Sequence, residues 1–130
     1  MKDTFVLEGV RLRYADEPAP DKRDELERVK ILNQFSEILP MLEENNDSRR
    51  CVATFMTEHE GQLTYACPSL VHIFVEDNKV CIKTYFRSLH ISNNFEFDKN
   101  TMRLLLQLAC ERLNLQPGFI KIFVGCPHGT

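Results

Sequence analysis

The stretch LVHIFVEDNKVCIKTYF, residues 70–86, carries the clearest structural signal in this sequence of 130 residues. Two runs rich in Val, Ile, Phe and Tyr flank the tetrapeptide EDNK, residues 76–79. Side chains of these types favour strands, and Asp and Asn favour tight turns between strands. The stretch therefore predicts a β-hairpin, around which the rest of the chain must be arranged.

Upstream of the hairpin, the chain predicts a strand, a loop and a helix. Residues 4–14, TFVLEGVRLRY, alternate roughly as a short strand would, and the charged, proline-containing stretch ADEPAPDKRDE (15–25) favours an exposed loop. From Asp24 to Glu43, apolar residues recur at the spacing of a helix. They are Leu26, Val29, Leu32, Phe35, Leu39 and Leu42. Pro40 is expected to kink or shorten the last turn of this helix.

Between this helix and the hairpin, ENNDSRR (44–50) is expected to be a polar loop and CVATFM (51–56) a strand, followed by the connector TEHEGQLTYA (57–66). Four to six strands and two helices in mixed order then predict an α+β or mixed α/β fold. A chain of this length is expected to form a single domain, residues 1–130.

After the hairpin, RSLHISNNFEFD (87–98) is expected to be a long loop. Asp98 stands close enough to the helical run TMRLLLQLACERL (101–113) to cap it. The QPG stretch (116–118) is expected to end that helix, and FIKIFV (119–124) supplies a last strand.

Composition limits the classes of function that fit. The chain is 43% hydrophobic and 27% charged, with a net charge of -3, so no global field attracts it to nucleic acid or to an anionic membrane. The five cysteines include no CxxC pair, which favours reduced thiols over a disulfide framework. Without an apolar segment typical of a signal peptide or a membrane span, a cytoplasmic protein is expected.

Two cysteines are candidate nucleophiles, Cys67 before the hairpin and Cys126 near the end of the sequence. A single cysteine is more often a small buried hydrophobic residue, because reactivity requires a thiolate in a cationic or polar setting. Cys67 stands where a connector meets a strand, and such a position favours exposure. Cys126 and His128 form a C-x-H pair, but no repeated short spacing of ligands supports a metal site.

Two groups of arginines indicate phosphate binding. Arg49 and Arg50 are adjacent in DSRR, and Arg87 with Ser88 directly follows a strand. Such charges most often lie in solvated turns. If they converge, however, their guanidinium groups can supply several charge-assisted hydrogen bonds to one phosphate dianion.

The motifs DSRR, ACP, YFRS, FEFD and PHGT occur in an order that resembles the central section of the thymidylate synthase family, which includes the deoxycytidylate and cytidylate hydroxymethylases. The resemblance runs from about Lys30 to the end of the sequence and leaves residues 1–25 outside it. It implies a thymidylate synthase-like core, a mixed β-sheet packed by about two helices.

The resemblance also implies roles at matching positions. Cys67 falls on the thiol that adds to C6 of a pyrimidine, which makes C5 a nucleophile toward a one-carbon unit. Arg87 and Ser88 fall on residues that bind the nucleotide phosphate, and His128 on a histidine that contacts the sugar. Asp98 falls where members acting on cytosine carry Asp and members acting on uracil carry Asn, so cytosine is favoured.

Further implications concern assembly. Arg49 and Arg50 match arginines that reach a partner subunit's phosphate, so a homodimer is expected. Pro68 replaces the histidine that usually follows the cysteine, and His90 replaces an aspartate that serves the pterin. Most of the family's residues for folate binding have no counterpart in this sequence. A folate one-carbon donor is therefore implied only if the protein is active.

Three hypotheses remain open. The first is a compact pyrimidine nucleotide C5 methyl- or hydroxymethyltransferase, which a partner chain could complete. The second is a dimerising, nucleotide-binding protein without chemistry. The third is a purely structural homologue, in which Cys67 would be buried and the arginines would lie apart.

Overall fold

A computed structural model describes residues 4–8, 17, 19, 22–59, 61–90 and 95–128. Within these ranges only the backbone is described for residues 8, 23, 56–59, 63–67, 88–90, 127 and 128. The described elements are β1 (Thr4–Glu8), α1 (Lys22–Glu44), β2 (Val52–His59), β3 (Gln62–Glu76), β4 (Lys79–His90), α2 (Phe95–Leu113) and β5 (Gln116–His128).

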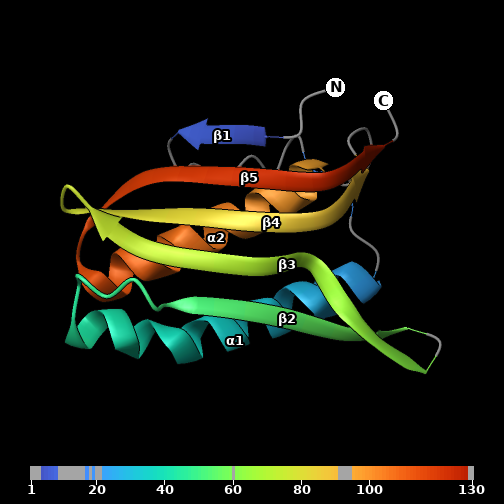
Figure 1. Ribbon diagram of the computed structural model, residues 1–130, viewed down its shortest axis with the longest axis horizontal. Helices are drawn as coiled ribbons and strands as arrows, with labels where there is room; N and C mark the ends of the chain where they lie inside the picture. The colour runs from blue at the N-terminus through green and yellow to red at the C-terminus, as the bar shows by residue number, and fades with distance from the viewer. Residues whose placement is uncertain are drawn as a thin grey trace.

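The strands form one five-stranded sheet in the order β1-β5-β4-β3-β2. The β4 and β5 strands are parallel and are joined through α2, whereas the other neighbouring pairs are antiparallel. Figure 1 shows α1 and α2 side by side on one face of this sheet. This two-layer arrangement of helices and a mixed sheet confirms the predicted α+β fold.

The hairpin predicted from residues 70–86 is confirmed. Glu76 pairs with Lys79 across the turn, and Asp77 and Asn78 have φ angles of 52° and 59°. Both turn residues are thus left-handed, as a type I′ hairpin requires, and Asn and Asp tolerate this conformation better than other non-glycine residues.

The hydrophobic core lies between the sheet and the helices. Side chains alternate along the strands, so that Val80, Ile82 and Phe86 of β4 point to the helices and are fully buried. From α1 the core receives Ile31, Phe35, Leu39 and Leu42. The spacing of these residues puts them on one side of the helix, facing β2 and α2.

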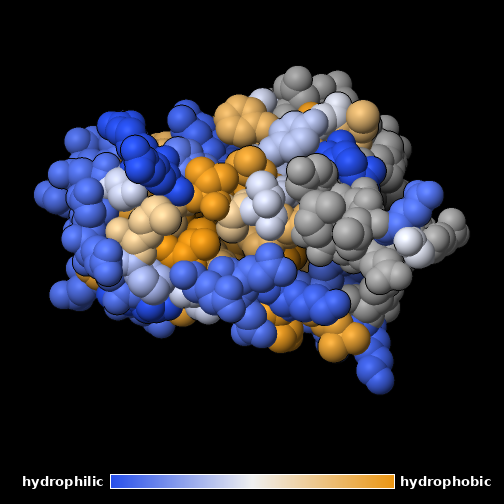
Figure 2. Space-filling view, turned by 60° about the horizontal axis from the view of Figure 1, so that its bottom comes forward, coloured by the Kyte–Doolittle hydropathy of each residue, from blue (hydrophilic) through white to orange (hydrophobic). Residues whose placement is uncertain are grey.

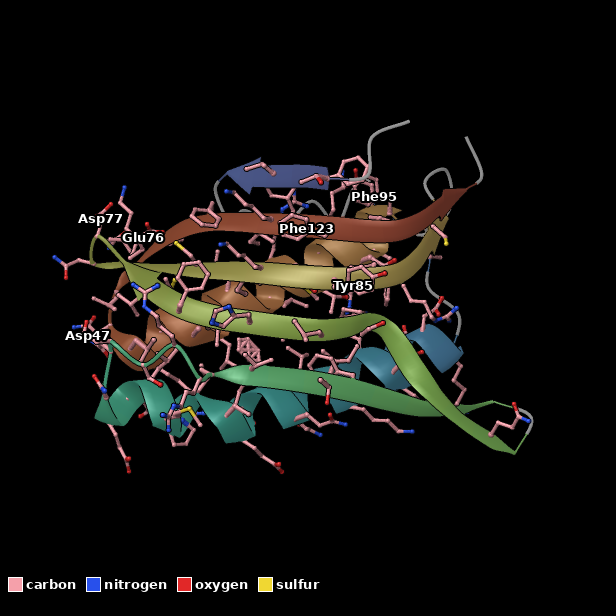
Figure 3. All side chains as sticks on the ribbon, in the orientation of Figure 1. Asp47, Glu76, Asp77, Tyr85, Phe95 and Phe123 are labelled. Atoms are coloured by element: carbon pink, nitrogen blue, oxygen red, sulfur yellow. The ribbon has the colours of Figure 1, made fainter. Side chains whose placement is uncertain are left out.

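The face of the sheet away from the helices carries exposed apolar side chains. Tyr85 and Phe123 are paired residues on β4 and β5 and are 44% and 38% exposed. Figure 3 shows both on the side of the sheet opposite α2. Val6 and Val52 lie exposed on the two edge strands. In Figure 2, viewed from the side of β2 and α1, hydrophobic surface gathers in the middle, with hydrophilic residues to its left and below it.

The first helix differs from its prediction in three ways. It begins at Lys22, inside the stretch predicted as a loop, and it continues past Pro40 to Glu44 instead of being shortened. Leu26 and Val29 are 57% and 52% exposed, so they do not belong to the core. Their spacing fits a helix, but Asp24, Glu27 and Arg28 in the same turns are the residues that face inward, so Leu26 and Val29 lie on the outward side of α1. Neither described helix is both long and apolar enough to cross a membrane.

The second helix begins earlier than predicted, at Phe95, so Asp98 lies inside its first turn and is not its cap. It ends at Leu113, where Asn114 takes a left-handed φ of 55° and the Leu115 N–H donates to the Cys110 carbonyl over 3.1 Å. This is a Schellman-type ending. The prediction that QPG ends the helix was wrong, because those residues already belong to β5.

The connector predicted at residues 57–66 was also wrong. These residues continue β2 to His59 and start β3 at Gln62, with Gly61 at the turn in a left-handed conformation (φ 79°). The long loop predicted at residues 87–98 is likewise replaced at its start by β4 and at its end by α2. Residues 9–14 and 91–94 lie outside the described part of the chain.

Candidate functional site

The β3 strand bulges at the position of Cys67. Thr54 of β2 pairs with Leu70, but Met56 pairs with Tyr65, so the four residues 66–69 of β3 stand opposite the single residue Phe55. The pairing of β3 with β4 starts only at Leu70. The backbone from Ala66 to Ser69 therefore leaves the regular ladders on both sides, where β3 bends in Figure 1. Bulges of this kind re-aim side chains and are frequent beside active sites.

Pro68, the residue after Cys67, is buried and lines a small cavity under the sheet. The described lining comprises Asp24, Glu27, Arg28, Ile31, Pro68, Phe97, Asp98 and Thr101. The cavity has a volume of about 30 Å³. That is the space of about one water molecule. A whole nucleotide does not fit in it, although a single polar substituent on a ring would.

Arg28 is the single cation in this described lining, and its Nε and Nη2 donors are already in use. Its Nη2 donates to Glu17 Oε1 and to the Phe97 carbonyl, each over 2.7 Å, and its Nε donates to Thr101 Oγ1 over 2.8 Å. The guanidinium carbon also lies 3.7 Å from the centre of the Phe97 ring. Arg28 thus links residue 17, α1 and α2, and its charge is offset by Glu17.

Three carboxyl groups share the same cavity, those of Asp24 and Glu27 on α1 and that of Asp98 on α2. Burial raises the pKa of Asp98 well above its ordinary value, and the charges of Asp24 and Glu27 raise it further, against a smaller lowering by Arg28. The position of Asp98 in the first turn of α2 would by itself stabilise the charged carboxylate and lower its pKa. Desolvation and like charges outweigh that effect here, so the pKa of Asp98 is raised and not lowered.

Arg87 is an exposed residue of β4. It lies two residues beyond Tyr85, so both side chains are on the sheet face away from the helices. Tyr85 lies over Gly125 of β5, where any Cβ would collide with the Tyr85 hydroxyl. The cavity of Asp98 lies under the other face, and Arg87 is not part of its described lining. The structure thus brings Asp98 together with the neighbour of Cys67, but it does not bring Arg87 into that cavity.

Three predicted site residues, Cys67, Ser88 and His128, and also His90, are described only through their backbones or their registers. Ser88 pairs with Cys126, and His128 pairs with His90, at the ends of the parallel strands β4 and β5. Figure 1 shows these strand ends, the start of α2 and the bend of β3 at one end of the sheet. The side chains of Cys67, Ser88, His90 and His128 lie outside the described part of the structure.

Arg49 and Arg50 lie far from this end. They are exposed in the loop between α1 and β2, where the Arg50 N–H donates to Ser48 Oγ over 3.3 Å. In Figure 1 this loop lies at the same end of the sheet as the β3–β4 turn, opposite the bend of β3. Within one chain, therefore, the arginine pair and Cys67 do not meet.

Of the other cysteines, Cys51 and Cys81 are buried and Cys110 is partly buried. Burial raises the pKa of Cys51 and of Cys110 to about 11 and also raises the pKa of Cys81. These thiols are protonated near neutral pH, which makes them poor nucleophiles. Cys126 is exposed on β5. Among the described side chains, no three His, Cys, Asp or Glu residues gather as a metal site would require.

Sequence reasoning missed the contribution of α1 to this cavity. Asp24, Glu27, Arg28 and Ile31 recur at helical spacing and so share one side of α1. That spacing was available in the sequence. Nothing in it indicated that this side would meet Asp98, which lies some seventy residues further along the chain.

A model of the thymidylate synthase family matches residues 9–128, nearly the whole sequence. The chain belongs to the thymidylate synthase family. It is also 27% identical over 99 residues to the thymidylate synthase of Mycoplasma genitalium, an alignment that covers 75% of this chain and 34% of that protein. This thymidylate synthase-like chain thus corresponds to about a third of the length of the curated relative. Membership of the thymidylate synthase family agrees with the sheet and helices described above.

Proposed function

We propose that this thymidylate synthase-like protein binds a pyrimidine nucleoside monophosphate, with cytosine preferred, beside the bulge at Cys67. The observation that carries the proposal is the cavity in which Asp98 meets Pro68, the residue next to Cys67. Family membership supplies the class of ligand. The size of the cavity supports a base whose exocyclic group at C4 enters it while the ring stays outside.

The chemistry proposed for Cys67 is covalent. Its thiolate forms an S–C6 bond, and the π pair of the C5–C6 double bond moves to C5, which then takes a proton from water or a one-carbon unit from a donor. Loss of the original C5 hydrogen and expulsion of the thiolate restore the ring. The transfer to C5 would require a folate donor, and a partner chain could complete that part of the site.

The proposed phosphate contacts come from two chains. Arg87 and Ser88 would bind the phosphate within one chain, and His128 would contact the sugar. Because Arg87 stands on the face away from the Asp98 cavity, the nucleotide would have to lie across the end of the sheet, where β4 and β5 end. Arg49 and Arg50 lie at the opposite end of the sheet, so they would serve the site of a second copy. Supporting this, the sheet face away from the helices exposes Tyr85 and Phe123, which a face-to-face homodimer would bury.

The alternative is a catalytically inactive homologue that dimerises and binds nucleotide, or that serves a structural role. The residues Pro68 and His90 favour it, because they stand where the family usually carries a histidine and an aspartate. General acid and base groups each contribute orders of magnitude to a rate, so their replacement would lower turnover strongly.

Release of tritium from dCMP labelled at C5 distinguishes the two functions. If the thiol attacks C6, the wild-type protein releases tritium to water without any one-carbon donor, and Cys67→Ser abolishes the release. A wild-type protein that binds dCMP but releases no more tritium than Cys67→Ser would contradict the enzymatic proposal and favour the binding protein.

A further inference from the structure

The sheet face away from the helices carries a row of basic side chains across its middle. Lys121 of β5 is the register partner of Lys83 on β4, and Lys83 is in turn the partner of His72 on β3. These three residues form the basic row. Because β4 is the central strand, the row crosses the centre of the face. Neighbouring strands lie about 4.8 Å apart, so two ammonium groups and an imidazole come close together there.

Aromatic rings flank the basic row and hold its lysines. Lys83 Nζ lies 5.4 Å from the centre of the Phe74 ring, and Lys121 Nζ lies 4.9 Å from the centre of the Phe119 ring. The two rings pack edge to face on each other, with their centres 5.9 Å apart. Both ammonium groups therefore lie beside the same pair of rings, and cation–π attraction favours this position.

No carboxylate beside the basic row offsets its charge among the described side chains. On this face, Glu76 lies at the hairpin turn, where it is the register partner of Lys79. His72 Nε2 is buried and has no hydrogen-bond partner in the part of the chain that the structure describes. Buried polar atoms are normally paired, and an oxygen atom of a bound anion would supply the missing partner.

The charge of the basic row affects how a second copy can cover this face. A two-fold axis through the middle of the face sets the row of one copy against the row of the other. Four ammonium groups would then share an interface with little water, where like charges repel strongly. We propose that one tetrahedral oxyanion, such as phosphate, binds between the two basic rows and strengthens the homodimer. This inference rests on the face-to-face assembly in the proposed function.

The chemistry of the basic row suits such an anion. Each lysine ammonium group has three donors, and hydrogen bonds from charged donors to phosphate oxygens are short and strong. An anion that binds the dimer and not the monomer strengthens the association by linkage. Since Arg49 and Arg50 are proposed to serve the partner's nucleotide site, the anion would also regulate how many of those sites are complete.

Sedimentation equilibrium tests the inference by measuring the dissociation constant of the dimer with and without about 10 mM inorganic phosphate, with the ionic strength kept equal by chloride. The wild type should associate at least about tenfold more tightly in phosphate. Lys83→Met/Lys121→Met removes the repulsion and the donors to the anion together. This variant should therefore dimerise in chloride about as tightly as the wild type does in phosphate, and phosphate should not change its association.

Two controls exclude other effects of phosphate. Lys22→Met/Lys30→Met removes the same number of charges from exposed positions on α1, so it should keep the response to phosphate if the response is not one of net charge. Arg87→Ala removes the proposed contact to the nucleotide phosphate. It should also keep the response, because the anion between the copies is not held by Arg87.

The outcomes separate this inference from nucleotide binding. Equal association of the wild type in both salts, or a response that persists in Lys83→Met/Lys121→Met, would overturn it. So would a protein that stays monomeric in phosphate, and binding of single-stranded oligo(U) through the same lysines would then assign the face to nucleic acid. Calorimetry with dCMP completes the comparison. If dCMP binds but phosphate does not affect the dimer, the inference alone fails, whereas a phosphate-linked dimer that binds no dCMP contradicts the proposed nucleotide site alone.

Discussion

The side chain of Asp98 is costly for the folded protein to ionise. Burial and the neighbouring charges of Asp24 and Glu27 raise its pKa well above the value in an unfolded chain, which is about 3.9. Between these two pKa values the folded state holds a proton that the unfolded state has lost. The free energy of unfolding therefore falls as pH rises from about 4 through the folded pKa and is constant above it.

Asp98→Asn should remove this cost, because asparagine has nearly the same shape and no charge. We expect the variant to be increasingly more stable than the wild type as pH rises through the folded pKa, by about 1.4 kcal/mol for each unit by which that pKa is raised. Urea unfolding at several pH values measures this difference. Glu25→Gln should show no such trend, because Glu25 is exposed on α1 and is not part of the described lining of the cavity. Parallel curves for Asp98→Asn and the wild type would contradict the prediction.

At the scale of secondary structure elements, two arginines link α1 to α2 in different surroundings. Arg28 and Glu17 form a pair whose side chains are 13% and 8% exposed. Arg112 of α2 donates to the Ser36 carbonyl over 2.9 Å and pairs with Glu43, but these side chains are 33% and 39% exposed. The buried pair should matter far more when broken, because it leaves the Glu17 carboxylate without its cation in a mostly buried site, with Asn100 as its remaining described donor.

Arg28→Ala should therefore destabilise the protein by about 3 kcal/mol, whereas Arg112→Ala should cost about 0.5 kcal/mol, as exposed pairs usually do. Chemical denaturation at one pH measures both changes. Equal losses for the two variants would show that the network around Arg28 does not hold the helices together more firmly than the surface pair.

The sequence indicated some elements better than others for physical reasons. The β3–β4 hairpin depends on neighbouring residues alone, strand-forming runs and an Asp77-Asn78 turn, so it could be predicted in full. Residues 57–66 of β2 and β3 are mostly polar and are interrupted by Gly61. That composition is equally typical of a loop. Their pairing depends on the rest of the sheet, and local composition does not reveal it.

The candidate site shows the same division. Cys67, Arg87 and Asp98 were picked out as candidates by their motifs. The bulge at residues 66–69, however, arises where β3 changes its register against β2, and the sequence of one strand alone does not encode such a change. The contact between Arg28 and Thr101 joins residues 73 positions apart. How α1 packs on α2 decides that contact and the cavity beside it, and the sequence could not indicate that packing.

At the scale of the whole molecule, one face of the sheet is covered by helices and the other presents apolar side chains (Figures 1 and 3). If a second copy covers this face, a charge placed there should separate the copies. Phe123→Glu is expected to change the sedimentation coefficient at micromolar concentration from that of a dimer to that of a monomer.

Leu26→Glu is the matched control for this prediction. Leu26 is exposed too, but it lies on α1, away from the sheet face. Its replacement should leave the assembly unchanged. A wild-type protein that sediments as a monomer, or a Phe123→Glu variant that remains a dimer, would contradict assembly through this face.

The central claim is that a pyrimidine nucleoside monophosphate binds at the end of the sheet where β3 bulges. Titration calorimetry with dCMP, CMP and dUMP tests it most directly, with Arg87→Ala to remove the proposed phosphate contact and Lys79→Ala to remove an exposed cation from the other end of β4. We predict binding to the wild type and to Lys79→Ala, and at least about tenfold weaker binding to Arg87→Ala. No heat with any of the three nucleotides, or equal affinity in Arg87→Ala, would contradict the account.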